Sequence, residues 1–169
     1  LEAGRIVGLL GENGCGKTTL LKTIAGVNAG YSGEVRVLGN APGPETKAVT
    51  AFLPDSEFLP RKLAVRYCLD LYDDLFADFD RARALDMIGN FGLNESMKLS
   101  EMSKGMREKV QVSLTMSRRA KLYLLDEPIS GVDPAAREGI LQAILDNLES
   151  DSLLVMSTHL VHDLEPALD

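Results

Sequence analysis

Runs of apolar residues, and changes in their spacing, outline the elements of this chain. Residues 5–10 form a short apolar run, which predicts a strand buried on both faces of a sheet. After a glycine-rich turn, residues 17–25 carry apolar side chains along one side of a predicted helix. Residues 34–40 alternate apolar with polar and predict a half-exposed strand. Residues 48–53 predict a further apolar strand, which ends at Pro54.

A helical block occupies the middle of the chain. From about residue 58 to residue 118, apolar side chains recur at steps of three and four, which is typical of helices. Residues 122–125 and 153–156 are apolar runs that predict core strands. A helix between them begins with Asp133 as N-cap and Pro134 at its first position. Strand, helix and strand in this order predict a right-handed parallel unit, and hence an α/β fold.

Composition limits the classes of protein that fit this pattern. The chain has 169 residues, of which 45% are hydrophobic, as expected for one compact domain. No apolar run approaches the roughly 20 residues that a membrane span needs. The formal net charge of −7 argues against a protein that coats nucleic-acid backbones, because such proteins carry a basic face. Cys15 and Cys68 have no spacing typical of a disulfide framework, so we expect reduced thiols.

A phosphate-binding loop is predicted between the first strand and the first helix. The sequence GENGCGKT matches the pattern of a glycine, four residues, and Gly-Lys-Ser/Thr in the expected strand–loop–helix context. Lys17 is expected to neutralise the β- and γ-phosphates of ATP, and the Thr18 hydroxyl to bind Mg²⁺. A flexible glycine turn before a helix is the plainer interpretation, but the complete match argues against it. The residues expected to bind the nucleotide are Gly11, Glu12, Asn13, Gly14, Cys15, Gly16, Lys17, Thr18 and Thr19.

Two adjacent carboxylates follow the apolar strand at residues 122–125. The ends of parallel strands gather around ligand crevices, so Asp126 and Glu127 are expected at such a crevice. Asp126 suits the Mg²⁺ shell, and Glu127 suits a base that polarises the attacking water. Alone, the pair is equally well explained as solvated acids at a strand end. Together with the phosphate loop, it predicts nucleotide hydrolysis.

Three further segments complete a resemblance to the ABC ATPases. Met102-Ser103-Lys104-Gly105-Met106 stands where that family carries its LSGGQ signature. Ser130-Gly131-Val132-Asp133 resembles the D-loop of the family. Ser157-Thr158-His159 resembles its switch histidine. The motifs follow one another in the order of the family, and the resemblance extends over essentially the whole chain.

The resemblance implies a fold and a division into domains. The fold is that of P-loop, RecA-like NTPases: a parallel sheet core with a small antiparallel β portion and an inserted helical subdomain. Residues 1–57 are expected to be the first part of the core and residues 58–118 the helical signature subdomain. Residues 119–169 are expected to be the second part of the core, and the whole to be one ABC ATPase domain.

The resemblance also implies that ATP is sandwiched between two such domains, with residues 11–19 of one facing the signature of the other. By that likeness the signature contacts are Ser103, Lys104, Gly105 and Met106. The likeness assigns His159 to the γ-phosphate, so that His159, Lys17 and Glu127 form the catalytic set. An ordinary N-capped helix is the alternative interpretation of the signature segment.

Two positions depart from the usual family pattern. The signature reads SKGM where many members have SGGQ, and Asp55 stands in place of the Q-loop glutamine. An aspartate there implies a ligand of Mg²⁺ or of its water. This combination is most similar to the bacterial ABC-2-type exporter ATPases.

The family resemblance implies a transporter motor with two partners: a second ABC ATPase domain and a transmembrane permease subunit, docked near residues 52–63 on the cytoplasmic face of the membrane. No nucleic acid is expected as a partner. A non-transport ABC ATPase of translation or DNA repair is the alternative, although the 86 positions (103 − 17) from Lys17 to Ser103 leave no room for a long coiled-coil arm. A nucleotide-binding module that no longer hydrolyses ATP is a third possibility.

The ends of the chain suggest a fragment. It begins at Leu1 rather than Met and stops at Asp169, soon after an apolar run. By likeness to the family, it lacks the N-terminal strand with the aromatic residue that stacks on adenine. Since an aromatic pair contributes about 1 kcal/mol, we expect weaker nucleotide binding than in the parent protein.

Overall fold

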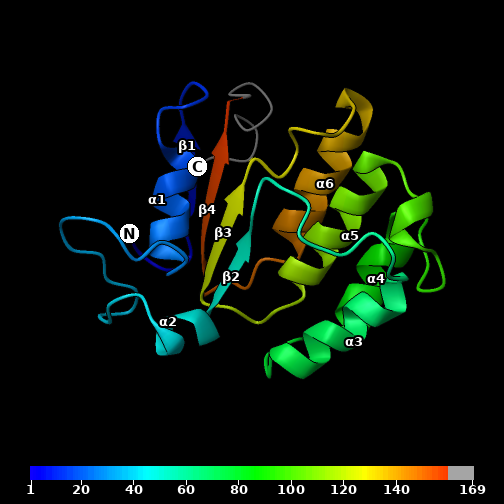
Figure 1. Ribbon diagram of the computed structural model, residues 1–169, viewed down its shortest axis with the longest axis horizontal. Coiled ribbons are helices and arrows are strands. Elements are labelled where there is room, and N and C mark those ends of the chain that lie inside the picture. The colour runs from blue at the N-terminus through cyan, green and yellow to red at the C-terminus, as the bar shows by residue number, and fades with distance from the viewer. Residues whose placement is uncertain (160–169) are drawn as a thin grey trace. The chain divides into compact units, whose positions relative to one another are not determined.

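The computed structural model describes residues 1–159, and Figure 1 shows the elements along the chain. The chain divides into two compact units. Unit 1 contains residues 1–55, residues 120–128 and, within the described part of the chain, residues 149–159. Unit 2 contains residues 56–119 and 129–148. Unit 1 holds the strands, and unit 2 holds most of the helices.

Unit 1 is built on a four-stranded, entirely parallel sheet (Figure 1). The strand order is β1 (Ile6–Leu10), β4 (Leu153–Thr158), β3 (Leu122–Asp126) and β2 (Thr50–Leu53). All five residues of β3 are buried, as its continuous apolar sequence predicts. The parallel pairing of β3 with β4 confirms the parallel arrangement predicted for these two strands.

Helix α1 (Lys17–Ile24) covers part of this sheet and confirms the predicted helix. Its Leu21 is fully buried and belongs to one apolar cluster with Leu124 and Val155 of the sheet. No side chain caps the start of the helix, where Gly16 has the left-handed φ of 99°. Its first N–H groups are therefore available to an anion.

The predicted strand at residues 34–40 does not form. Val37 and Asn40 instead exchange their backbone hydrogen bonds across a tight turn, as an isolated antiparallel bridge. Leu38 and Gly39 both have positive φ, 49° and 84°, which is typical of a two-residue hairpin turn. Alternation of apolar and polar residues predicts only that one face is buried; it supplies no neighbouring strand to take the hydrogen bonds.

The segment before β2 also differs from its prediction. Residues 44–48 form the short helix α2 (Pro44–Ala48), although the strand was expected to begin at residue 48. Pro44 occupies the first turn, and the Thr46 hydroxyl accepts a hydrogen bond from the Gly43 N–H at 2.8 Å. These local bonds favour a helical turn, so β2 begins only at Thr50.

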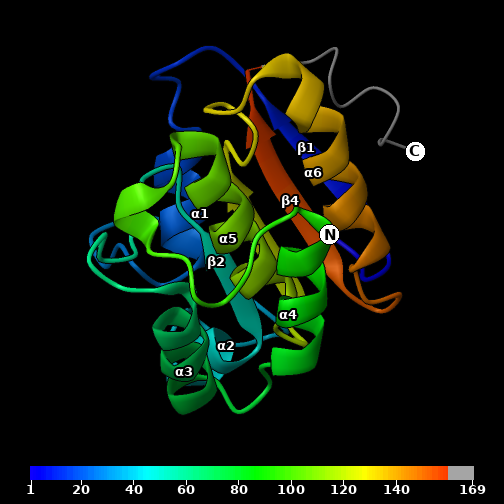
Figure 2. The same cartoon turned by 90° about the vertical axis from the view of Figure 1, so that its right-hand side faces the viewer.

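Unit 2 is helical, as predicted for most of its length, and Figure 2 gives a second view of its helices. Its elements are α3 (Val65–Leu75), α4 (Arg81–Asn90), the 3-10 helix η1 (Leu99–Glu101), α5 (Lys104–Met116) and α6 (Pro134–Asp146). The Asp133 carboxylate caps α6 by accepting a hydrogen bond from the Ala135 N–H, which confirms that predicted helix start. No helix among residues 1–159 is both long and apolar enough to cross a bilayer.

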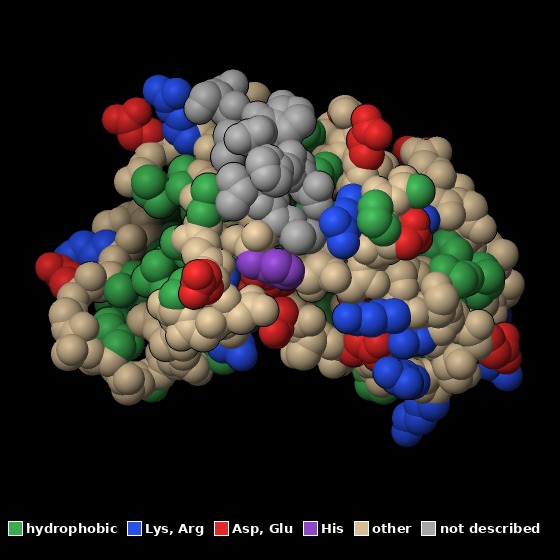
Figure 3. All heavy atoms as spheres, turned by 90° about the horizontal axis from the view of Figure 1, so that it is seen from above, with side chains coloured by type: hydrophobic (Ala, Val, Ile, Leu, Met, Phe, Trp, Pro, Cys, Tyr) green, Lys and Arg blue, Asp and Glu red, His purple; other side chains and the backbone are tan. Residues whose placement is uncertain are grey.

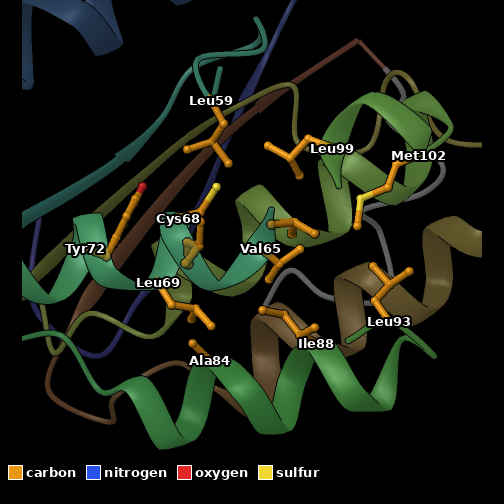
Figure 4. Close-up of a cluster of buried hydrophobic side chains, with 12 residues drawn as sticks. Leu59, Val65, Cys68, Leu69, Tyr72, Ala84, Ile88, Leu93, Leu99 and Met102 are labelled. Atoms are coloured by element: carbon orange, nitrogen blue, oxygen red, sulfur yellow. The ribbon is translucent and has the colours of Figure 1, made fainter. Parts of the chain in front are cut away.

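The core of unit 2 is the apolar cluster shown in Figure 4. Leu69 of α3 and Ala84 and Ile88 of α4 are all at most 1% exposed and interdigitate there. Cys68 is buried in the same cluster, and burial raises the pKa of its thiol to about 11. This thiol is therefore neutral at physiological pH and packs as a small apolar side chain.

Arg118 is the most deeply buried arginine side chain among the ion pairs of unit 2, at 4% exposure. It makes two hydrogen bonds to Asp78, of 2.8 and 2.9 Å, and its guanidinium lies 4.1 Å from the ring centre of Phe76. Paired and stacked in this way, the buried charge is compensated.

Candidate functional site

The glycine-rich loop joins the carboxyl end of β1 to the start of α1, and its residues 12–16 are exposed. Gly14 and Gly16 have φ values of 87° and 99°, which other residues adopt only with strain. A Cβ at Gly11 would lie 2.7 Å from the Cys15 sulfur. The loop therefore needs its glycines in order to fold tightly at the end of the sheet.

Lys17 lies inside the curve of this loop, with only 7% of its side chain exposed. Its ammonium donates hydrogen bonds to the carbonyl oxygens of Gly11, at 2.7 Å, and Glu12, at 3.1 Å. It also forms an ion pair with Glu127 Oε1 at 3.7 Å. One cation thus bridges the predicted phosphate loop and the predicted acid pair.

Asp126, the last residue of β3, is fully buried. Its Oδ1 accepts a hydrogen bond of 2.6 Å from the Ser157 hydroxyl, while its Oδ2 is buried without a hydrogen-bond partner. A buried carboxylate oxygen without a donor costs free energy unless a cation approaches it. The donor set therefore fits Mg²⁺, which commonly binds one or two carboxylates together with substrate phosphates.

Glu127 has an unusual backbone conformation, with a φ of 51°. Such left-handed conformations cost a non-glycine residue about 1–3 kcal/mol. The N–H of Glu127 donates to the carbonyl and hydroxyl oxygens of Ser157, at 3.2 and 3.1 Å, and these bonds hold the turn. Its carboxylate is 12% exposed, and its Oε1 makes no hydrogen bond.

His159 follows β4 and lies beside the acid pair. Its Nδ1 is 2.9 Å from Glu127 Oε2. Figure 3 shows a histidine side chain, in purple, beside acidic side chains in red on one face of the molecule. About a third of its side chain, 37%, is exposed. Lys17, Glu127 and His159 therefore form a continuous chain of contacts at one end of the sheet.

The signature segment lies in unit 2, at the start of α5. The exposed Ser103 caps this helix, its hydroxyl accepting a hydrogen bond of 3.2 Å from the Met106 N–H. Lys104 is 58% exposed. The side chain of Met106 is partly buried against the apolar cluster of Figure 4, so it serves packing where many family members have a glutamine.

Two predicted Mg²⁺ ligands are not joined to the cluster by any contact found among residues 1–159. Asp55 is exposed two residues beyond the end of β2, and Thr18 is half-buried in the first turn of α1. Their assignments stay predictions.

Ser157 is the site residue that the sequence analysis missed. Its hydroxyl contacts both members of the acid pair, but we had named it only as part of the switch segment. A signal was present, because Ser157 is a polar residue at the end of an apolar run. In the parallel register it stands directly opposite Asp126.

The fold and this cluster define a class of protein. A parallel sheet whose first strand leads through a GENGCGKT loop into an uncapped helix, with an acid pair at the end of a neighbouring strand, is a P-loop nucleotide-binding fold. Comparison with known families gives a match to the ABC transporter family over residues 1–130. The chain belongs to the ABC transporter family.

Individual relatives agree with this assignment. The ABC transporter ATP-binding protein YtrB of Bacillus subtilis is 30% identical over 98% of this chain, which spans 58% of the length of that relative. A solved structure of the ATP-binding subunit of an ABC transporter is 28% identical to this chain, with a TM-score of 0.86. The match covers 99% of this chain and 73% of the chain in that structure.

A chain from the complex of an archaeal ribosomal stalk protein with an archaeal ribosome recycling factor is 25% identical, with a TM-score of 0.76. This match covers 99% of this chain and 31% of the chain in that structure. The expected P-loop NTPase fold is therefore confirmed.

Proposed function

We propose that this chain binds MgATP and hydrolyses it as the ATP-binding domain of an ABC transporter. One observation carries the proposal: the chain of contacts from the loop carbonyl of Gly11 through Lys17 and Glu127 to His159. It joins a phosphate-binding cation, a carboxylate that can orient water, and an imidazole at the end of one sheet, which suits hydrolysis of a terminal phosphate.

Binding begins with the loop and the start of α1. The backbone N–H groups and the positive end of the helix attract the phosphates of ATP, and Lys17 exchanges its loop carbonyl partners for phosphate oxygens. Mg²⁺, when bound, neutralises charge on the β- and γ-phosphates. Asp126 and Thr18 would hold it, with Asp55 as a further ligand.

Hydrolysis depends on the carboxylate of Glu127. Its Oε1 makes no hydrogen bond and lies 3.7 Å from the Lys17 ammonium, so it keeps lone pairs with which to orient the attacking water and accept a proton from it. The His159 imidazole holds the other oxygen at 2.9 Å, and it contacts the γ-phosphate with its second nitrogen. The bonds from the Glu127 N–H to Ser157 fix the direction in which the carboxylate points.

The assembled form is a pair of these domains with two ATP molecules between them. In each site, Ser103 and the N–H groups at the start of α5 in one copy contact the ATP held by the loop of the other. ATP favours the closed pair because only in that state does it contact both the loop of one copy and the start of α5 in the other. Hydrolysis of ATP removes this preference for the closed pair. Residues 52–63 pass the resulting motion to a permease subunit in the membrane. The sequence SKGM and the aspartate at position 55 favour an ABC-2-type exporter.

A non-transport role in translation is the second candidate, supported by the similarity to the chain from the ribosome recycling factor complex. Both roles use the same nucleotide chemistry. Co-purification of the full-length protein with a permease in detergent supports the first candidate, whereas co-sedimentation with ribosomes supports the second.

Steady-state phosphate release tests the proposal. Removing a general base lowers rates about 10²–10⁴-fold, so Glu127→Gln is expected to abolish most turnover while ATP binding persists. Lys17→Ala is expected to lose both, because it removes the cation that binds the phosphates. Turnover at the wild-type rate in Glu127→Gln would exclude Glu127 as the base.

A further inference from the structure

A pair of oppositely charged side chains marks the first turn of α5 in unit 2. Lys104 and Glu108 stand one turn apart, with 3.6 Å between Nζ and Oε1. The lysine side chain is 58% exposed, whereas the glutamate side chain is only 13% exposed. The cation therefore lies at the surface, with its counter-ion beneath it.

Helix stability does not explain this arrangement. A lysine in the first turn faces the positive end of the helix dipole, which disfavours it. The order Lys then Glu, four residues apart, is also the weaker orientation for such a pair. A position that breaks local rules without a local gain is typical of a functional site.

The glutamate is held at a cost. Burial raises the pKa of Glu108, and the Glu57 carboxylate acts in the same direction, while Lys104 and Arg107 oppose the shift. Its Oε2 is buried without a hydrogen-bond partner. The Lys104 ammonium is therefore a main compensation for the charge of this carboxylate.

The ion pair lies directly against the backbone of Gly131, in the segment that leads into α6. A Cβ built at Gly131 would be 2.0 Å from Glu108 Oε1 and 2.4 Å from Lys104 Nζ. Position 131 must therefore lack a side chain if the pair is to keep this geometry. The glycine of the predicted D-loop thus leaves the space that the Lys104 ammonium and the Glu108 carboxylate occupy.

We propose that Glu108 is a positioning residue, which holds the Lys104 ammonium over Gly131 so that it meets the terminal phosphate of ATP bound by a second copy. The inference rests on the proposed function. Lys104 directly follows the Ser103 cap at the N-terminus of α5, where its exposed ammonium adds a full charge to the partial positive charge of the helix end. A substitution at Gly131 therefore affects ATP contact by moving the Lys104 ammonium.

Two substitutions test the pair in different ways. Glu108→Gln removes the counter-charge with little change in shape, and Gly131→Ala displaces both charged ends without altering either charge. In a Glu127→Gln background, we measure the MgATP concentration that gives half-maximal dimer. Each substitution is expected to raise it about three- to fivefold, as loss of a surface ion pair allows. In a Lys104→Met background, neither Glu108→Gln nor Gly131→Ala is expected to raise this MgATP concentration further.

Three comparisons make the result specific. Glu101→Gln breaks an exposed pair with Lys98 in the same unit, at 3.8 Å, and is expected to leave the midpoint unchanged. ATP binding to dilute monomer, measured by calorimetry, is expected to stay at the parent value in the Glu108 and Gly131 variants. A thermal melt followed by circular dichroism checks that each variant is folded.

The outcomes separate the two claims. Absence of MgATP-dependent dimers in the Glu127→Gln parent overturns the proposed function, and this inference with it. Dimers in the parent, with an unchanged midpoint in Glu108→Gln, overturn the inference alone. The inference is also overturned if Glu108→Gln shifts the midpoint MgATP concentration equally in chains with Lys104 and with Met at position 104. A glutamate with a merely structural role would behave in that way.

Discussion

Ser157 connects the two carboxylates on which the site depends. Its hydroxyl donates to Asp126 Oδ1 at 2.6 Å and accepts from the Glu127 N–H at 3.1 Å. The first bond leaves Asp126 Oδ2 for a cation, and the second supports the strained φ of Glu127. One small buried side chain thus orients both groups.

We predict that Ser157→Ala lowers ATP turnover about tenfold, because misplacing an orienting group by a fraction of an ångström is costly in catalysis. An unsatisfied buried acceptor also costs about 1–3 kcal/mol of the free energy of unfolding. The matched control is Ser152→Ala, which removes a buried hydroxyl bonded to the Ala120 carbonyl in the same unit. It is expected to lose stability but to keep its turnover per folded molecule, and equal kinetic losses in both variants would contradict the role of Ser157.

At the scale of single residues, the sequence predicted the site residues that belong to recognisable motifs. Lys17, Asp126 and Glu127 lie together in the structure because a P-loop and a strand end bring them to the same edge of a sheet. The φ of Glu127 and the two bonds of Ser157 could not be predicted, because they depend on the register between β3 and β4. No spacing within one segment contains that information.

The start of α5 is tied to the segment around Glu57 by a network of charges. Glu57 Oε1 is 2.8 Å from Arg107 Nη2, and Oε2 is 2.9 Å from Arg61 Nε. Arg107 also donates to the Met102 carbonyl, just before the Ser103 cap. This network fixes the geometry of the chain where the signature begins.

We predict that Glu57→Gln lowers the free energy of unfolding by about 1 kcal/mol at pH 7, as expected for a partly buried ion pair. The hydrogen bond from Arg107 is the largest cause that lowers the pKa of Glu57 below its ordinary value of 4.5. The folded state therefore favours the ionised carboxylate, so this stabilisation is present above pH 4.5 and is lost as the pH falls through the lowered pKa. Denaturant titrations at pH 7 and at acid pH are expected to show a difference from wild type that shrinks in acid.

The exposed Glu34, paired with Arg36 in unit 1, provides the control for this experiment. Glu34→Gln is expected to change stability by no more than a few tenths of a kcal/mol, as is usual for surface pairs. A Glu57→Gln difference that stays constant with pH would show that the carboxylate charge is not the cause.

Predictions of whole elements succeeded where periodicity and caps agreed. Helix α6 has an apolar face, an Asp133 cap and Pro134 in its first turn, and it forms as expected. The expected strand at residues 34–40 had alternation alone, and the chain turns at Leu38 and Gly39 instead. A strand takes its hydrogen bonds from a neighbouring strand, often distant in sequence, whereas a helix satisfies its own bonds locally.

At the scale of the whole molecule, the chemistry is divided between the two units. Lys17, Glu127 and His159 lie in unit 1, whereas Ser103 and Lys104 lie in unit 2. In the proposed mechanism, a complete ATP site takes its loop from one copy and its signature from another. The central claim is therefore about association, since one copy supplies only part of each site.

Light scattering on Glu127→Gln, with and without MgATP, tests that claim most directly. This substitution prevents hydrolysis, so the closed pair accumulates; we predict that the mass doubles when MgATP is added and returns to the monomer value when it is removed. Lys17→Ala is the control and is expected to stay monomeric throughout. Glu127→Gln chains that bind MgATP but remain monomers would contradict the sandwich mechanism.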